Sequence, residues 1–87
     1  MTEGTPATAT ATLRIKVYGP LREFVAAGEF AHATASGRTV RQVILETGVP
    51  EEHLVYTMCL VNGRRVKLDE PVQDGDALDI FQPVAGG

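Results

Sequence analysis

One segment of the sequence, residues 40–47, has the spacing of an amphipathic helix. Val40, Val43 and Ile44 fall on one helical face, and Thr39 just before them is a good N-cap. A glycine and a proline soon after the segment supply a C-terminal stop. The other patterned segments alternate or form short apolar runs, as strands do. Because a helix that is apolar on one side lies across a sheet, the sequence predicts an α+β roll in which one main helix covers a mixed sheet of four or five strands.

Five segments have the patterns of β-strands. Leu13, Ile15 and Val17 alternate with more polar neighbours, which is typical of a half-buried strand. The pair Asn62-Gly63 favours a type I′ hairpin turn, because both residues accept a positive φ. The predicted strands are residues 13–18, 29–35, 57–61, 64–67 and 77–82. The predicted core consists of Leu13, Ile15, Val17, Val40, Val43, Ile44, Leu60, Leu78 and Ile80.

Asp74 and Asp76 flank Gly75 immediately before the last predicted strand. Acidic residues beside a glycine are typical of tight turns, and turn chemistry is sufficient to explain both. In the strand that follows, Asp79 and Phe81 are expected to face away from the core. A large ring on the solvent side of a strand has no obvious folding role, so Phe81 is a candidate contact residue for a partner.

The two ends of the chain differ in composition from its middle. Residues 1–12 are rich in threonine and alanine, and ordering them would bury little apolar surface, so we expect a flexible N-terminal tail. Residues 13–83 are expected to form one domain. Residues 84–87 are expected to form a mobile, reactive C-terminal tail that ends in Gly-Gly.

Composition and charge exclude several classes of function. The net charge of −3 and the lack of a basic stripe make nucleic-acid binding a poor expectation. The single cysteine, Cys59, excludes an internal disulfide, and its apolar neighbours predict a packed, inert thiol. No apolar run approaches the roughly 20 residues that cross a bilayer, and no signal peptide is evident. We therefore expect no membrane association and a cytoplasmic location.

The sequence contains no recognisable set of catalytic residues, and its most distinctive feature is the pair of glycines at the C-terminus. His32 and His53 lack partners at metal-ligand spacing, so we expect no metal, no bound cofactor and no intrinsic enzyme activity. Gly86 and Gly87 have no Cβ and could enter a narrow channel. An α-carboxylate has a pKa of roughly 3.5, so at neutral pH it is ionised and can attack an activated phosphate.

Three segments together resemble a known family. The hairpin LVNGRRV at residues 60–66, the run DGDALDIF at residues 74–81 and the ending PVAGG at residues 83–87 are similar to the MoaD/ThiS family of ubiquitin-like sulfur carriers. This family includes the small subunit of molybdopterin synthase and the carrier of the thiamine pathway. The resemblance covers about residues 13–87 and implies a β-grasp fold. Gln82 departs from the pattern, since molybdopterin-type members often have a proline or an apolar residue there.

The resemblance also implies chemistry at Gly87. A partner of the ubiquitin-activating type would use ATP to adenylate the Gly87 carboxylate, and a sulfur donor would displace AMP to leave a thiocarboxylate. A second partner, such as a molybdopterin-synthase large subunit, would then take the sulfur for the molybdenum cofactor. Gly86 and Gly87 match the family's diglycine, and Phe81, Pro83 and Val84 match the apolar segment that docks on partners.

Several alternatives remain open at the level of sequence. The protein could be a ubiquitin-like modifier that is joined to lysines of target proteins through Gly87. It could also be a sulfur carrier for thiamine, cysteine or tRNA thiolation. A third class is a pure interaction domain in which the terminal glycines have no reactive role.

Overall fold

The computed structural model describes residues 10–83, which form one mixed five-stranded sheet and one α-helix. The strands are β1 (Thr10–Val17), β2 (Glu29–Ala35), β3 (Met58–Val61), β4 (Arg64–Val66) and β5 (Ala77–Phe81), and the helix is α1 (Val40–Glu46). Two 3-10 helices, η2 (Gly19–Phe24) and η3 (Glu51–Tyr56), lie in the connections. The predictions for residues 1–9 and 84–87, a flexible N-terminal tail and a mobile, reactive C-terminal tail, lie outside the described residues.

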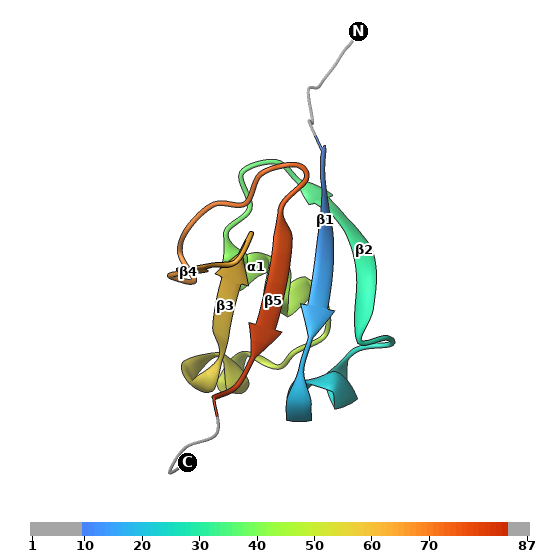
Figure 1. Cartoon of the computed structure of the whole chain (residues 1–87), viewed down its shortest axis with the longest axis vertical. Helices are drawn as coiled ribbons and strands as arrows, with labels where there is room; N and C mark the ends of the chain where they lie inside the picture. Colours follow the sequence, from blue (N-terminus) through green and yellow to red (C-terminus); the bar gives the residue numbers. More distant parts are fainter. Residues whose placement is uncertain (1–9, 84–87) are drawn as a thin grey trace, which may run out of the picture.

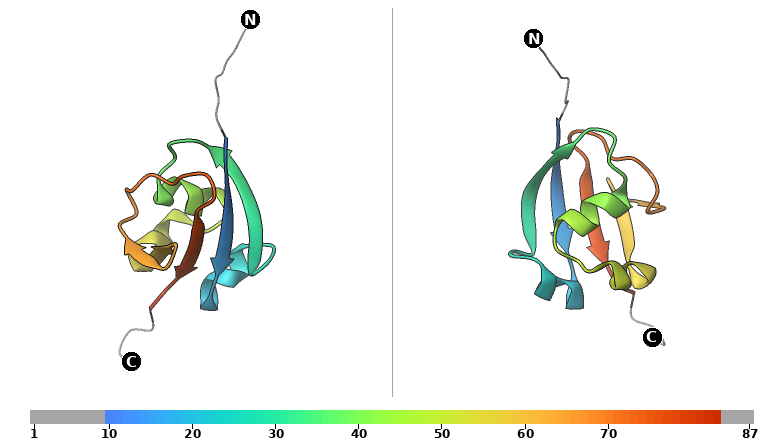
Figure 2. Two further views of the ribbon diagram at one scale, coloured as in Figure 1. Left: turned by 45° about the horizontal axis from the view of Figure 1, so that its top comes forward. Right: turned by 180° about the vertical axis from the view of Figure 1, so that it is seen from behind.

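The sheet has the order β2-β1-β5-β3-β4, with α1 across one face (Figures 1 and 2). The central strand β5 is parallel to its neighbour β1, and every other neighbouring pair is antiparallel. The first and last strands in the sequence are therefore neighbours in the middle of the sheet. This arrangement confirms the predicted α+β roll with one main helix on a mixed sheet.

Strand β1 begins at Thr10, three residues before the predicted start. Residues 10–12 pair with the end of β2, and Ala11 is fully buried opposite Thr34. The expected flexible tail over residues 1–12 is therefore wrong for these three residues. Their small side chains bury little apolar surface. The backbone is ordered by the ladder hydrogen bonds to β2, which do not depend on the side chains. The strand ends at Val17, one residue earlier than predicted.

Helix α1 forms where the sequence predicts it, with Thr39 as its N-cap. The Thr39 hydroxyl accepts a hydrogen bond from the Gln42 backbone N–H at 3.2 Å, and the Gln42 side chain accepts one from the Thr39 N–H at 2.9 Å. This capping box satisfies two donors of the first turn. At the other end Gly48 has φ +114°, and a Cβ there would lie 2.5 Å from the Phe24 carbonyl oxygen. Only glycine fits this close approach of η2 to the end of the helix.

Eight of the nine predicted core residues are buried, and Leu60 is the exception. In β3 the inward residues are Cys59 and Val61, which pair with Ile80 and Leu78 of β5. All four residues of β3 are apolar, so its sequence has no alternation from which to read the inward face. The pairing with β5 sets that face instead, and Leu60 lies half-buried on the outer side of the sheet. The connections add four buried apolar residues, Leu21, Val49, Leu54 and Val72.

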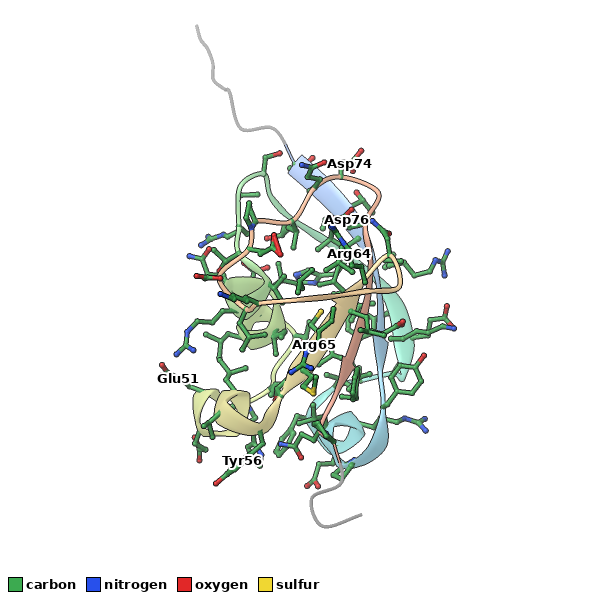
Figure 3. All side chains as sticks on the ribbon, turned by 60° about the vertical axis from the view of Figure 1, so that its left-hand side comes forward. Glu51, Tyr56, Arg64, Arg65, Asp74 and Asp76 are labelled. Carbon is green, nitrogen blue, oxygen red and sulfur yellow. The ribbon has the colours of Figure 1, made fainter. Side chains whose placement is uncertain are left out.

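The Asp74-Gly75-Asp76 turn ties three parts of the sheet together at one end (Figure 3). The Asp74 carboxylate accepts a hydrogen bond from the backbone N–H of Thr12 at 2.8 Å. The Asp76 carboxylate accepts one from the Gln73 N–H at 2.8 Å and one from the Asn62 amide at 2.9 Å. The interpretation of both acids as turn residues is confirmed, and their bonds fix where β5 begins.

Candidate functional site at the end of strand β5

Strand β5 leads the chain to the end of the domain opposite the Asp74–Asp76 turn (Figure 1). Its position is fixed on both sides, by the parallel register with β1 and the antiparallel register with β3. The Tyr18 backbone N–H also donates a hydrogen bond to the Ile80 carbonyl at 2.9 Å. The described chain ends at Pro83, two residues past the strand, and the predicted site residues Val84, Gly86 and Gly87 lie outside it.

Phe81 lies on the outer face of the sheet, opposite the face that α1 covers. It is half-buried and lines a shallow groove of about 280 Å³ with Tyr18, Leu60 and Asp79. Tyr18 is 45% exposed. The prediction that Asp79 and Phe81 face away from the core is confirmed. Tyr18, Leu60 and Phe81 form an apolar surface on the outer face, and Phe81 is two residues before the end of the described chain.

Gln82 and Pro83 lie beside the 3-10 helix η3. The Gln82 side-chain amide lies 3.4 Å from His53 Nδ1 of η3. The His53 ring in turn stacks at a tilt on Phe24 of η2, with ring centroids 4.8 Å apart. His53 therefore has structural neighbours at the beginning of the C-terminal segment.

A second apolar surface lies on the other side of Pro83 and was not expected from the sequence. Pro83 lines a hollow of about 420 Å³ with Val55 and Tyr56. These two residues are 78% and 68% exposed. Residues 51–55 have no strand or long-helix pattern in the sequence and would be expected to form a connector with at most one helical turn. The useful signal was Leu54, because a short turn that buries one apolar residue exposes the apolar residues next to it.

Cys59 is fully buried, as predicted for a packed thiol. Burial raises the pKa of the Cys59 thiol to about 12, and the nearby negative charge of Asp79 contributes in the same direction. The thiolate is the reactive form of cysteine, so this thiol is not available as a nucleophile at neutral pH.

His32, Arg38 and Glu46 form a polar cluster. The Glu46 carboxylate lies 2.8 Å from His32 Nε2 and 3.4 Å from Arg38 Nε, which joins β2 to the end of α1. Burial favours the neutral form of Glu46, but hydrogen bonds with His32 and Thr34 and the charges of His32 and Arg38 outweigh it, so the pKa of Glu46 is lowered. The cluster has a structural role in holding the helix on the sheet.

No group of three or more His, Cys, Asp or Glu side chains in residues 10–83 could hold a metal ion. No helix in this range is long and apolar enough to cross a membrane.

Comparison with solved structures identifies the fold. The putative molybdopterin converting factor subunit 1 of Pyrococcus furiosus is 26% identical, with a TM-score of 0.68 over 85% of this chain and 99% of that one. Small archaeal modifier protein 1 of Haloferax volcanii is 22% identical, with a TM-score of 0.67 over 85% of this chain and 99% of that one. Subunit 1 in the complex of subunits 1 and 2 of the Helicobacter pylori molybdopterin-converting factor is 22% identical, with a TM-score of 0.58 over 87% and 99% of the two chains. These neighbours have the ubiquitin-like β-grasp fold, as predicted.

No significant match was found among curated proteins. The model of the ThiS family matches residues 15–87, which includes nearly the whole domain and the C-terminal segment. The match agrees with the resemblance inferred from the hairpin, the Asp-Gly-Asp turn and the terminal glycines. This chain is therefore a member of the ThiS family of ubiquitin-like proteins.

Proposed function

We propose that this protein carries sulfur as a thiocarboxylate on Gly87 and donates it to a partner enzyme. The observation that carries the proposal is the extent of the family match, which continues through Gly86 and Gly87. The proposal requires Gly87 to bear the free α-carboxylate. The protein is then a co-substrate, and catalysis belongs to its partners.

The thiocarboxylate would form in two steps. An oxygen of the Gly87 carboxylate attacks the α-phosphorus of ATP, and pyrophosphate leaves as the acyl adenylate forms. Hydrosulfide, as the sulfur donor, then attacks the activated carbonyl carbon, AMP leaves with the bridging oxygen, and the thioacid loses its proton to give the thiocarboxylate. This chain supplies the nucleophile of the first step, an ionised carboxylate, and the adenylating partner supplies the phosphate site.

In this reaction the folded domain presents the reactive terminus to the partner and supplies no competing nucleophile. Its only cysteine has a pKa raised to about 12, so Cys59 does not compete for the transferred sulfur. Residues 84–87 can span at most about 13–14 Å when extended. That length lets the terminus reach into a partner's site while Pro83 and the domain stay at its entrance.

We assign partner docking to Phe81, Pro83 and Val84. Phe81 presents a half-buried ring beside Leu60 and Tyr18 on the outer face of the sheet, and Pro83 lies at the end of the same strand. Aromatic residues in apolar surroundings are the usual anchors of protein interfaces. The position of this surface just before the reactive segment would let one partner hold the domain and receive the terminus.

We propose molybdenum cofactor synthesis as the pathway. The solved neighbour with 26% identity is a putative molybdopterin converting factor subunit 1, and a second neighbour of that type was solved in complex with its subunit 2. The partners would then be an adenylating enzyme and a large subunit that accepts the sulfur, and the location would be cytoplasmic. The alternatives are a protein modifier joined to lysines through Gly87 and a carrier for thiamine, cysteine or tRNA thiolation.

Intact-protein mass spectrometry tests the proposal. The purified chain is incubated with a ubiquitin-activating-type enzyme from its own organism, ATP and a sulfur donor. We expect a gain in mass equal to the difference between sulfur and oxygen, located at Gly87. Gly86→Ala and a chain with one residue appended after Gly87 should fold normally and lose this product, because each places a side chain or an extra residue in the narrow partner channel.

Two results would overturn or redirect the proposal. If the extended chain gains sulfur at its new end as fast as the wild type, the terminal glycine is not the recognised element. If the wild type gives no thiocarboxylate but forms higher-mass conjugates in lysate, the protein is a modifier. Co-purification with a molybdopterin-synthase large subunit tests the pathway separately.

A further inference from the structure

A groove runs along the beginning of β3, between η3 and β4. One hollow of about 700 Å³ extends to Glu70, and a second of about 420 Å³ extends to Pro83. Both are lined by Thr57, Met58 and Arg65, so they are adjacent, and we treat them together as one groove. Met58 and Arg65 lie opposite Phe81 and Leu60 in the sheet register, so the groove adjoins the one on the outer face and differs from it by extending around β4 to Val66, Leu68 and η3.

The floor of the groove is apolar. Met58, Val66 and Leu68 line the larger hollow, and Val55 and Tyr56 line the smaller one. Val55 and Tyr56 are 78% and 68% exposed, although both are large apolar side chains. A run of exposed apolar residues in a depression marks an interaction site more often than isolated exposed residues do.

The rim of the groove is cationic, although the protein has a net charge of −3. Arg65 and Lys67 line the groove, and Glu70 is the acid among its lining residues. Within residues 10–83 the arginine ion pairs are those of Arg14, Arg38 and Arg41, and none includes Arg65 or Lys67. Arg65 and Tyr56, both labelled in Figure 3, line the same hollow, and the pairing of Arg65 with Leu60 places Arg65 on the outer face at the edge of the sheet. Two cations beside an apolar floor fit a ligand that combines carboxylates with apolar groups.

The backbone of β4 adds hydrogen-bonding groups at the edge of the sheet. Val61 and Arg64 close the two-residue Asn62-Gly63 turn, so they form a hydrogen-bonded pair. Pairs alternate along an antiparallel ladder, so Arg65, opposite Leu60, directs its backbone N–H and C=O away from β3. An edge strand with such groups is a template for another extended chain.

We propose that this groove binds an extended peptide segment of a partner protein, in which apolar residues alternate with acidic ones. The apolar side chains would lie on Val66 and Leu68, and a carboxylate on the other face would form a bidentate hydrogen bond with the Arg65 guanidinium beside Met58. The peptide backbone would bond to the β4 edge at Arg65. Alternation suits this arrangement because neighbouring side chains of an extended chain point in opposite directions.

This inference goes beyond the proposed function and does not depend on sulfur transfer. Peptide binding in the groove requires no thiocarboxylate, ATP or adenylating enzyme. Because one end of the groove is at Pro83, a partner segment bound there would lie beside the C-terminal segment. The groove could therefore add affinity to a partner that also uses the terminus.

The test is an NMR titration of the full-length, isotope-labelled chain with a short synthetic peptide in which valine alternates with aspartate. We expect concentration-dependent shifts of the amides of Thr57, Met58, Arg65 and Leu68, with affinity that falls as salt is added. Arg65→Glu should weaken binding about tenfold or more, because the carboxylate pairing becomes a repulsion. Arg22→Glu on η2 is the matched control, since it makes the same change in net charge away from the groove and should leave the affinity within about twofold.

A peptide with lysine in place of aspartate should not bind. The proposal is overturned if the acidic and basic peptides bind equally, or if Arg65→Glu and Arg22→Glu have the same effect. It is also overturned if the acidic peptide causes no shifts at millimolar concentration, or if the shifts centre on Tyr18 and Asp79 and spare Val66 and Leu68. Failure of sulfur transfer with intact peptide binding would count against the proposed function alone.

Discussion

Phe81→Ala separates a role in partner docking from a role in folding. The ring is half-buried on the outer face of the sheet, where it lines the groove with Leu60 and Tyr18. Complete burial of a phenylalanine side chain contributes about 1.5–3 kcal/mol, so removing a half-buried ring should lower the free energy of unfolding by about 1 kcal/mol. For a domain of this size that loss corresponds to about 4–8 °C in Tm.

The effect of Phe81→Ala on binding should be larger. An aromatic anchor at the centre of an interface contributes about 2 kcal/mol or more, which is a loss of about 30-fold in affinity for the adenylating enzyme. Isothermal titration calorimetry at a temperature where both proteins are folded measures that loss. Thermal unfolding of the free protein measures the cost in stability.

Two further variants make the comparison decisive. Phe30→Ala removes a partly buried phenylalanine that packs against the core from β2, so it should lower Tm at least as much and leave affinity unchanged. Ile80→Ala, at a fully buried position, should lower the free energy of unfolding by about 2–5 kcal/mol. If Phe81→Ala lowers Tm as much as Ile80→Ala and leaves binding intact, Phe81 is a core residue and the docking assignment is wrong.

Three other predictions concern the stability and reactivity of the domain. Ile44→Ala should lower the free energy of unfolding in urea by about 2–5 kcal/mol, because Ile44 is fully buried, and a loss below about 0.5 kcal/mol would contradict the assigned helix face. Cys59 should react with iodoacetamide at pH 8 only in molecules that have unfolded, because burial excludes the reagent and raises the pKa of the thiol, and fast labelling of the native protein would refute its burial. The lowered pKa of Glu46 means that its ionised form stabilises the fold above the ordinary carboxyl pKa of 4.5, and this contribution is lost as the pH falls through the folded-state value. Glu46→Gln should therefore lower stability at pH 7 by a few tenths to about 1 kcal/mol, and the difference from wild type should shrink below about pH 4.5; a pH-independent difference would exclude the charge as its cause.

Much of the fold could be predicted from local sequence signals. The alternation of Leu13, Ile15 and Val17 gives the inward face of β1, and all three are buried. Thr39 and Gln42 form the cap that begins α1, and Asn62, with φ 53°, forms the hairpin turn. Each signal depends on residues within a few positions of one another, so the sequence contains the whole interaction.

The candidate site was predictable only in part. The outward position of Phe81 follows from the alternation of β5, and the structure confirms it. The hollow beside Pro83 did not follow, because its lining comes from η3, β3 and β4, and no short segment contains all three. The same reason explains why the cationic groove with Arg65 and Met58 was not expected.

The sequence by itself determined the class of fold, the positions of α1 and the hairpin, and the family, because caps, turns, alternation and the terminal glycines are local patterns. The tertiary structure decided which side of β3 faces the core and how far β1 extends. In β3 every residue is apolar, so the register with β5, and not hydrophobicity, buries Cys59 and exposes one side of Leu60. Residues 10–12 are ordered by backbone bonds to β2 and by the Asp74 carboxylate, sixty-two positions later in the chain. Pairing between distant strands is not encoded in the composition of either strand, so only the folded chain decides it.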